Sequence, residues 1–407
     1  MNRWMSLSTS LNMSLSLCMI VKNEAANLPR CLDSVKDVVD EMIVLDTGST
    51  DQTIAIAQSY GAKVYEFTWC DDFSAARNAA LPYVTGEWVL VLDADEVLLP
   101  AIVPALKTAI QNPKALVINL VRQEVGATQA PYSLVSRLFR KHPAIYFQRP
   151  YHAMIDDSVE ALLQQESHWE IINLPDIAIW HDGYQPEMIA ARDKWKKART
   201  TMEGFLAQHP NDPYVCSKLG ALYIQMGETT QGIELLQRGL QAETIDASTQ
   251  YELHYHLGSV YQELQEPLQA DEQYQQAMQQ PILPMLKLGA LHNWAALRQT
   301  HGDLDTAKIL YEQALEIDPH FTIAHYNLGM TLKALGDFAG AIGHYQTAIQ
   351  LQPDYADAYQ NLGVVLLKVG DMAGSRAAFQ QAIALHQQQG SPEAQRLQQS
   401  LRDMGML

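Results

Sequence analysis

The feature that most limits the fold of this chain is a pattern that returns every 34 residues in its second half. Pro319 and Pro353 are 34 residues apart, in the short segments DPHF and QPDY. The Leu-Gly pair recurs at Leu219-Gly220, Leu257-Gly258, Leu328-Gly329 and Leu362-Gly363, and Trp294-Ala295 fills the same place in a weaker copy. Other shared positions are Ala307, Ala341 and Ser375, then Tyr311, Tyr345 and Phe379, then Ala314, Ala348 and Ala382. A fixed period of this length predicts helical units that stack on one another and bury a continuous core.

A 34-residue period with small residues at helix crossings and an aromatic residue between them resembles the tetratricopeptide repeat. The resemblance covers roughly residues 213–389 in about five copies, and the last three are in strict register. We expect residues 390–407 to form a capping helix, because a solenoid must cover its last hydrophobic face. The resemblance implies a concave surface that binds a protein or peptide, with scaffolding or oligomerisation as the alternative.

The first half of the chain alternates strand and helix signals. Apolar runs occur in SLCMIV, EMIVLD, AKVYEF and EWVLVL, and segments with helical spacing separate them. Strands alternating with helices predict an α/β domain with a mostly parallel sheet, whose strands are apolar throughout because both faces are covered. We expect a loose tail over residues 1–13, this domain over 14–185 and a helical linker over 186–212.

Acidic residues follow two of these predicted strands. The apolar run Trp88–Leu92 leads directly into Asp93, Asp95 and Glu96, and Asp46 ends the second predicted strand. In sheets of this kind, ligands bind outside the carboxyl ends of the strands, so Asp46, Asp93 and Asp95 are candidate site residues. Two carboxylates two residues apart can both reach one divalent cation. Because unpaired buried carboxylates are costly, we expect such a cation or a basic partner.

One alternative enzyme fits the same acidic segment. VLVLDADEV matches the Asp-x-Asp-x-Val signature of haloacid-dehalogenase-like phosphatases, in which the first Asp is a nucleophile and the second an acid. That family places the signature on the first strand of its fold, whereas three strand–helix units precede it here. The phosphatase is therefore the lesser alternative.

Four segments in order point to a transferase. SLCMIVKNEAANLPRCLDS, MIVLDTGSTDQT, FSAARNAAL and GEWVLVLDADE resemble the inverting glycosyltransferases of family 2, closely over about residues 14–100 and more loosely to about 185. The resemblance implies the nucleotide-binding GT-A fold, which ends in an Asp-x-Asp (DXD) motif. It also implies a nucleotide-sugar donor, with a UDP-sugar the first choice, and a divalent metal, Mn or Mg.

The resemblance also assigns roles by position. It implies that Asp46 contacts the nucleobase and that Arg77 and Asn78 lie beside the nucleotide. The planar fork of donors on an arginine suits a diphosphate. Asp93 would touch the ribose or the metal, and Asp95 would bind the metal on the diphosphate.

The end of the domain carries two further expectations. His181, in IAIWHDGY, would ligate the metal or contact the diphosphate, as the resemblance implies. Inverting transfer needs a carboxylate that takes the acceptor proton. The repeat-bearing bacterial subgroup usually has His-Glu after a segment like RLFRKHPAIYFQRPYH, but this chain has His152-Ala153. Asp156 and Asp157 are the candidate bases, and the alternative is a non-catalytic repeat scaffold with a degenerate nucleotide-binding domain.

Composition narrows the remaining possibilities. The 407 residues carry a net charge of −18 without a basic patch, which argues against a nucleic-acid partner. The four cysteines form no Cys-x-x-Cys pair, so neither a disulfide framework nor a zinc site is expected, and a cytoplasmic location suits them. No apolar run approaches the roughly 20 residues of a membrane span.

Overall fold

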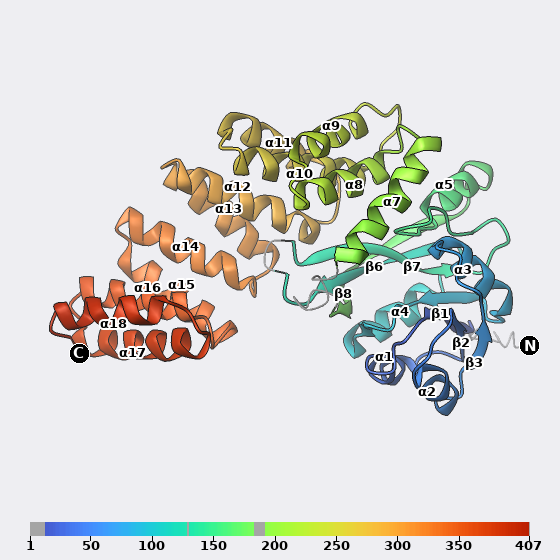
Figure 1. The fold of residues 1–407 in the computed structure, drawn as a ribbon, viewed down its shortest axis with the longest axis horizontal. Helices are drawn as coiled ribbons and strands as arrows, with labels where there is room; N and C mark the ends of the chain where they lie inside the picture. The colour runs from blue at the N-terminus through green and yellow to red at the C-terminus, as the bar shows by residue number, and fades with distance from the viewer. Residues whose placement is uncertain (1–12, 128–129, 183–191, 407) are drawn as a thin grey trace, which may run out of the picture. The chain divides into compact units, whose positions relative to one another are not determined.

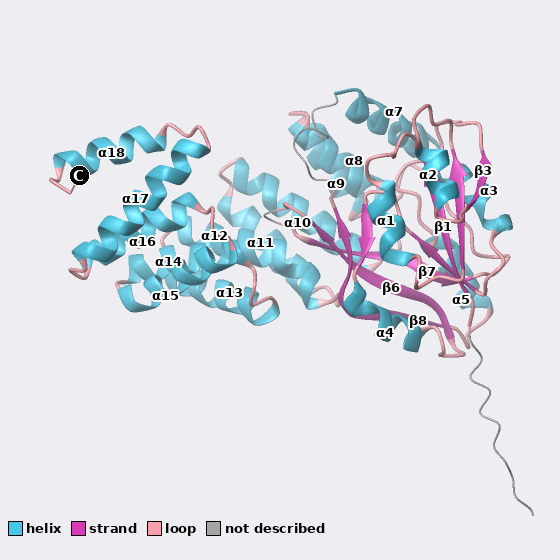
Figure 2. Ribbon diagram, turned by 90° about the horizontal axis from the view of Figure 1, so that it is seen from below, coloured by secondary structure: helices cyan, strands magenta, loops and turns pink. Residues whose placement is uncertain are grey.

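The computed structural model describes residues 13–127, 130–182 and 192–406 (Figure 1). The expected tail over 1–13 and the start of the expected linker therefore lie almost wholly outside the described residues. Contacts divide the chain into two compact units, Met1–Ala242 and Glu243–Leu407. All strands of the described residues belong to the first unit, and the described part of the second unit is helical (Figure 2).

One sheet organises the first unit, and its strands follow the order β3-β2-β1-β4-β7-β6-β8-β5. The strands are β1 (Leu15–Val21), β2 (Glu41–Asp46), β3 (Lys63–Glu66), β4 (Trp88–Val91), β5 (Glu96–Leu98), β6 (Ala115–Glu124), β7 (Tyr132–Arg140) and β8 (Glu170–His181). All run in one direction except β7, which is antiparallel to β4 and β6, and β5, which is antiparallel to β8. The mostly parallel sheet is confirmed, and the first four strands lie where the sequence predicts them.

Helices cover both faces of this sheet. They are α1 (Leu28–Val35), α2 (Thr53–Ser59), α3 (Phe73–Ala80), α4 (Val103–Ala109) and α5 (Asp156–Gln165), with short 3-10 turns at η1 (Leu81–Tyr83) and η2 (Pro100–Ile102). Leu17 and Met19 of β1 pack into the core under α1, α2 and α4, whereas Cys18 packs into the core under α3 and α5. Successive strand residues point to opposite faces, so a strand covered on both faces is apolar without a break.

The described residues of the first unit also form the helices α7 (Arg192–Gln208), α8 (Pro213–Gln225) and α9 (Thr229–Gly239). Tyr151, from the segment before α5, packs against the apolar core that α7 and α8 share. Asp212 caps α8 by accepting a hydrogen bond of 2.8 Å from the Val215 N–H. The first helix pair of the repeat region thus belongs, by its contacts, to the same compact unit as the sheet.

The second unit is a series of antiparallel helix pairs with a terminal helix. The elements are α10 (Ala247–Glu263), α11 (Pro267–Gln279), η3 (Pro284–Lys287), α12 (Leu288–Thr300), α13 (Leu304–Ile317), α14 (Thr322–Leu335), α15 (Phe338–Leu351), α16 (Ala356–Lys368), α17 (Met372–Gln388) and α18 (Glu393–Asp403). The all-α repeat architecture is confirmed, and a helix forms where the cap is expected.

Close helix crossings explain the Leu-Gly pattern. A Cβ built on Gly329 would lie 2.7 Å from the ring of Tyr345, and one on Gly363 would lie 2.8 Å from the ring of Phe379. The repeated glycine therefore makes room for the repeated aromatic residue of the next helix. Tyr311 and Tyr345 are fully buried, as expected of packing residues.

Gly329→Ala should destabilise the repeats by roughly 1–3 kcal/mol, because its Cβ would overlap the buried Tyr345 ring. Gly343→Ala is the matched control on α15, since Gly343 is exposed and a Cβ there meets nothing within 4 Å. That control should be neutral or stabilising by up to about 1 kcal/mol. Urea unfolding followed by circular dichroism measures both, and equal effects of the two substitutions would contradict this packing account.

Candidate active site

Asp46 ends β2 at the edge where the parallel strands terminate. Its Oδ1 accepts hydrogen bonds of 2.9 Å from the N–H groups of Gly48 and Ser49. Gly48 has φ of 103°, a left-handed conformation that glycine adopts without strain and that closes this turn. The Oδ2 of Asp46 is buried and has no partner among the described residues. A buried acceptor of this kind suits a ligand N–H, and the predicted contact with a nucleobase remains a prediction.

Asp93 follows β4 and is held between two arginines. Its Oδ1 pairs with Nη2 of Arg77 on α3 at 2.6 Å, and its Oδ2 pairs with Nη2 of Arg137 on β7 at 2.9 Å. Burial alone would favour the neutral acid, but the charges of Arg137 and Arg77 hold the pKa of Asp93 well below its usual range. The basic partner expected from the sequence is therefore present, and both Asp93 oxygens are engaged.

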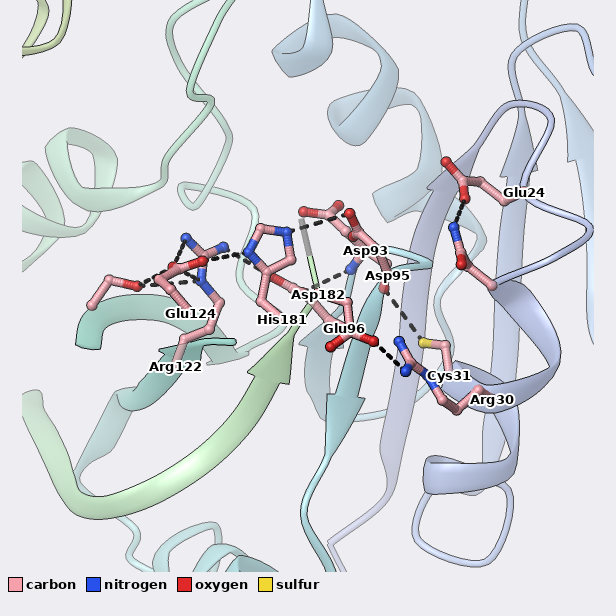
Figure 3. A network of polar contacts seen from close by, with 12 residues as sticks. Glu24, Arg30, Cys31, Asp93, Asp95, Glu96, Arg122, Glu124, His181 and Asp182 are labelled. Carbon is pink, nitrogen blue, oxygen red and sulfur yellow. Dashed lines mark hydrogen bonds and ion pairs between the residues drawn. The ribbon is translucent and has the colours of Figure 1, made fainter. Parts of the chain in front are cut away.

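Glu96 begins β5 and is completely buried. Its Oε2 accepts a hydrogen bond of 2.8 Å from the Asp93 N–H, and its Oε1 pairs with Nη1 of Arg122 at 2.9 Å (Figure 3). Burial opposes the charge on Arg122, but Glu96 and Glu124 raise the pKa of that guanidinium above its ordinary value. Glu96 thus fixes the backbone turn that carries Asp93 and Asp95.

Asp95 lies opposite His181, the last residue of β8 (Figure 3). The His181 Nε2 is 3.3 Å from Asp95 Oδ2, and the His181 Nδ1 is 2.6 Å from Glu124 Oε2. Burial lowers the proton affinity of this imidazole, but the bonds to Asp95 and Glu124 outweigh it and raise the pKa of His181 to about 9. The neighbouring Asp182 donates its N–H to the Asp95 carbonyl at 3.2 Å and pairs through its carboxylate with Arg30 of α1.

The residues around Asp95 fit a divalent-metal site in which the substrate supplies some of the ligands. The described residues contain no cluster of three or more ligating side chains, so a site held by the protein alone is not formed by them. Asp95 and His181 nevertheless place one carboxylate and one imidazole nitrogen 3.3 Å apart. Mg²⁺ commonly binds through one or two protein ligands and completes its shell with substrate phosphates and water. A metal shared with a bound diphosphate is the arrangement that these two residues suit.

The remaining predicted site residues lie on the helices α3 and α5. Asn78 on α3 exchanges two hydrogen bonds with the main chain of Phe147, at 2.8 and 2.7 Å. Asp156 and Asp157 form the first turn of α5. Asp156 accepts a hydrogen bond of 2.9 Å from the Ser136 hydroxyl, and Asp157 pairs with Arg149 at 2.6 Å. The nucleotide contact of Asn78 and the catalytic roles of Asp156 and Asp157 stay predictions.

Sequence reasoning did not single out Arg137, Glu96 or Glu124 for a role at this edge. Arg137 lies in SLVSRLFR, where apolar and polar residues come in pairs instead of alternating, so the segment carries only a weak strand signal. Nothing local in the sequence shows that β7 inserts next to β4. The Gly183 and Tyr184 of the IAIWHDGY motif lie outside the described residues.

Comparison with known proteins agrees with this architecture. The model of glycosyl transferase family 2 matches residues 16–172, and models of the TPR or tetratricopeptide repeat match four segments between residues 290 and 388. A TPR repeat-containing protein of Synechococcus elongatus is 47% identical over 304 residues, which are 75% of each chain. The chain therefore belongs to the family 2 glycosyltransferases that carry tetratricopeptide repeats.

Two further relatives bear glycosyltransferase names. An uncharacterized glycosyltransferase of Rickettsia bellii is 32% identical over 46% of this chain and 66% of its own length. The prophage-derived glycosyltransferase SunS of Bacillus subtilis is 26% identical over 54% of this chain and 52% of its own length. Among solved structures, the MamA protein matches with 18% identity and a TM-score of 0.37, over 44% of this chain and 95% of that one. In the described part of the chain, no helix is long and apolar enough to cross a membrane.

The contacts of His181 predict how the free energy of unfolding depends on pH in protein kept free of metal by EDTA. Its folded pKa of about 9 lies above the ordinary 6.5, so its stabilising contribution is complete below pH 6.5 and is lost as pH rises through 9. Between pH 6 and pH 9.5 the wild type should lose roughly 2 kcal/mol more unfolding free energy than His181→Gln. Urea unfolding at both pH values measures this difference, and parallel pH dependences would show that the ion pairs do not form.

Proposed function

We propose that this chain is an inverting glycosyltransferase that moves a sugar from a nucleotide-sugar, with UDP-sugars the first candidates, to a protein or peptide acceptor. Membership of family 2 supports the reaction class. The observation that carries the proposal is the buried Asp46 Oδ2, which no described residue partners, at the same sheet edge as the Asp95–His181 pair. Asp46 Oδ2 suits a nucleobase N–H, and the Asp95–His181 pair suits a metal-bound diphosphate. These are the two ends of a nucleotide donor. We place the reaction in the cytoplasm.

Each residue of the edge has a distinct part in this proposal. Asp46 accepts a hydrogen bond from the base and thereby sets the position of the nucleotide. Asp95 and His181 would hold the divalent metal, Mn or Mg, whose charge would offset that of the diphosphate. His181 would bind it through a neutral imidazole nitrogen. Asp93 contacts the ribose or the metal while it orients Arg77 and Arg137 beside the nucleotide.

The acceptor side of the reaction needs a base. In an inverting transfer, the acceptor atom loses its proton to a carboxylate as it attacks the anomeric carbon from the face opposite the leaving group. Asp156 and Asp157, in the first turn of α5, are the candidates that this chain offers near residues 152–153. The repeats bring the acceptor, because stacked helical pairs present an extended concave surface for peptides.

Removing the candidate metal ligand tests the donor side. Asp95→Asn should lower sugar transfer or donor hydrolysis about 100-fold or more, because metal-borne charge stabilisation amounts to several kcal/mol. Asp176→Asn is the control, since Asp176 is an exposed residue of β8. Turnover of a panel of nucleotide-sugars with added Mn or Mg measures both variants. Wild-type activity that EDTA does not reduce would contradict the metal-dependent mechanism.

The base assignment is tested by single substitutions in α5. If Asp156 or Asp157 is the base, its substitution by Asn should lower turnover roughly 10²- to 10⁴-fold. The same substitution should leave nucleotide affinity unchanged. Turnover by mass spectrometry and nucleotide binding by calorimetry separate these effects. Nucleotide binding without turnover in the wild type would favour a repeat scaffold with a retired transferase domain. Absence of any nucleotide binding would overturn both hypotheses.

A further inference from the structure

The segment Gln148–Met154, here called the clamp loop, is closed and strained. Gln148 and Met154 pair through two main-chain hydrogen bonds of 2.8 and 3.1 Å, so the five residues between them form a tight loop. Arg149 has φ of 69° and His152 has φ of 54°. Non-glycine residues rarely adopt these left-handed values, and such strain persists only where surrounding contacts hold it.

One side of the clamp loop touches the elements of the candidate active site. The Phe73 N–H at the start of α3 donates to the Pro150 carbonyl at 3.0 Å. Phe147, which precedes the loop, is bonded to Asn78 and lies under the Arg77 guanidinium at 5.5 Å from the ring centroid. Arg77 is the residue that pairs with Asp93. Phe147 and Arg77 therefore link the loop to Asp93 at the sheet edge, and α5 follows the loop directly.

The other side of the clamp loop is held by α8. The Arg149 guanidinium pairs with Asp157 of α5 at 2.6 Å and with Asp212, the N-cap of α8, at 2.9 Å. Arg149 is also stacked over Tyr214 of α8, at 5.1 Å from the ring centroid, and is 8% exposed. Tyr151 packs into the core that α7 and α8 share. Two carboxylates from two different helices thus converge on one buried arginine.

We propose that α8 is a positioning element for catalysis, and that Arg149 and Asp212 are positioning residues that hold the clamp loop and the start of α5 in the reactive arrangement. This inference rests on the proposed transferase function. Its physical basis is that a loop with two left-handed residues needs external contacts, and one of the two charged contacts, Asp212, is the N-cap of the first helix of the repeat region. The first helix of the repeat region is then part of the catalytic unit.

Asp212→Asn is the sharpest test, because asparagine still caps a helix but cannot pair with Arg149 as an anion. Hydrogen exchange followed by mass spectrometry should show faster exchange over residues 145–157 and unchanged exchange in β1 and β4. Arg149→Met should give the same pattern more strongly. Lys197→Met is the control, since Lys197 of α7 pairs with Asp71 of the α/β domain at 2.5 Å and lies over the Trp69 ring, and both of these partners are outside the clamp loop.

The functional arm measures nucleotide affinity and donor turnover in the same proteins. Asp212→Asn should keep the wild-type affinity for UDP and lower turnover about 10- to 100-fold, because small displacements of reacting groups cost this much. Unchanged exchange over residues 145–157 would overturn the clamp, whatever the activity. Faster exchange with undiminished turnover would overturn the positioning role. A wild type that binds no nucleotide would refute the proposed function, while the exchange experiment still decides whether the clamp exists.

Discussion

The contact on which the site depends is the double ion pair of Asp93 with Arg77 and Arg137. It joins α3, β4 and β7, so it ties the parallel strands of the first half of the domain to the inserted antiparallel strand. Removing one partner of a fully buried pair typically costs about 3–5 kcal/mol, and loss of one arginine here should cost less because Asp93 is partly exposed. The apolar strand β4 can end in negative charge because two guanidinium groups pair with the Asp93 carboxylate.

The three acids after β4 differ in how deeply they are buried and in the contacts that they make. Glu96 is completely buried and bonds the Asp93 N–H and Arg122, so it shapes the turn. Asp93 is half-buried and forms ion pairs with Arg77 and Arg137. Within the described residues, the Asp95 carboxylate is paired only with the His181 imidazole, and its role as a metal ligand remains a prediction. One short segment thereby shapes the turn, holds two arginines and presents the candidate metal ligand.

Much of this architecture follows from local pattern. The runs Leu15–Val21 and Glu41–Asp46 are strands with the bounds that the sequence predicts, since strands buried on both faces must be apolar throughout. The 34-residue period follows from glycine–aromatic crossings such as Gly329 with Tyr345. Asp46 could be placed at a strand end because the apolar run EMIVLD predicted the strand itself. Arg149 and Arg137 could not be placed in this way, because their partners Asp212 and Asp93 are 63 and 44 residues away.

The sequence by itself determined the first four strands, the helical repeats, the family and the acids that end two strands, because these depend on residues within one element, one repeat or a series of neighbouring segments. Only the tertiary structure decided what those acids do. The insertion of β7 beside β4 brings Arg137 to Asp93, and the pairing of β5 with β8 brings His181 to Asp95. These contacts depend on which strands are neighbours in the sheet. Neighbours in a sheet are chosen by the packing of the whole domain, which no local pattern records.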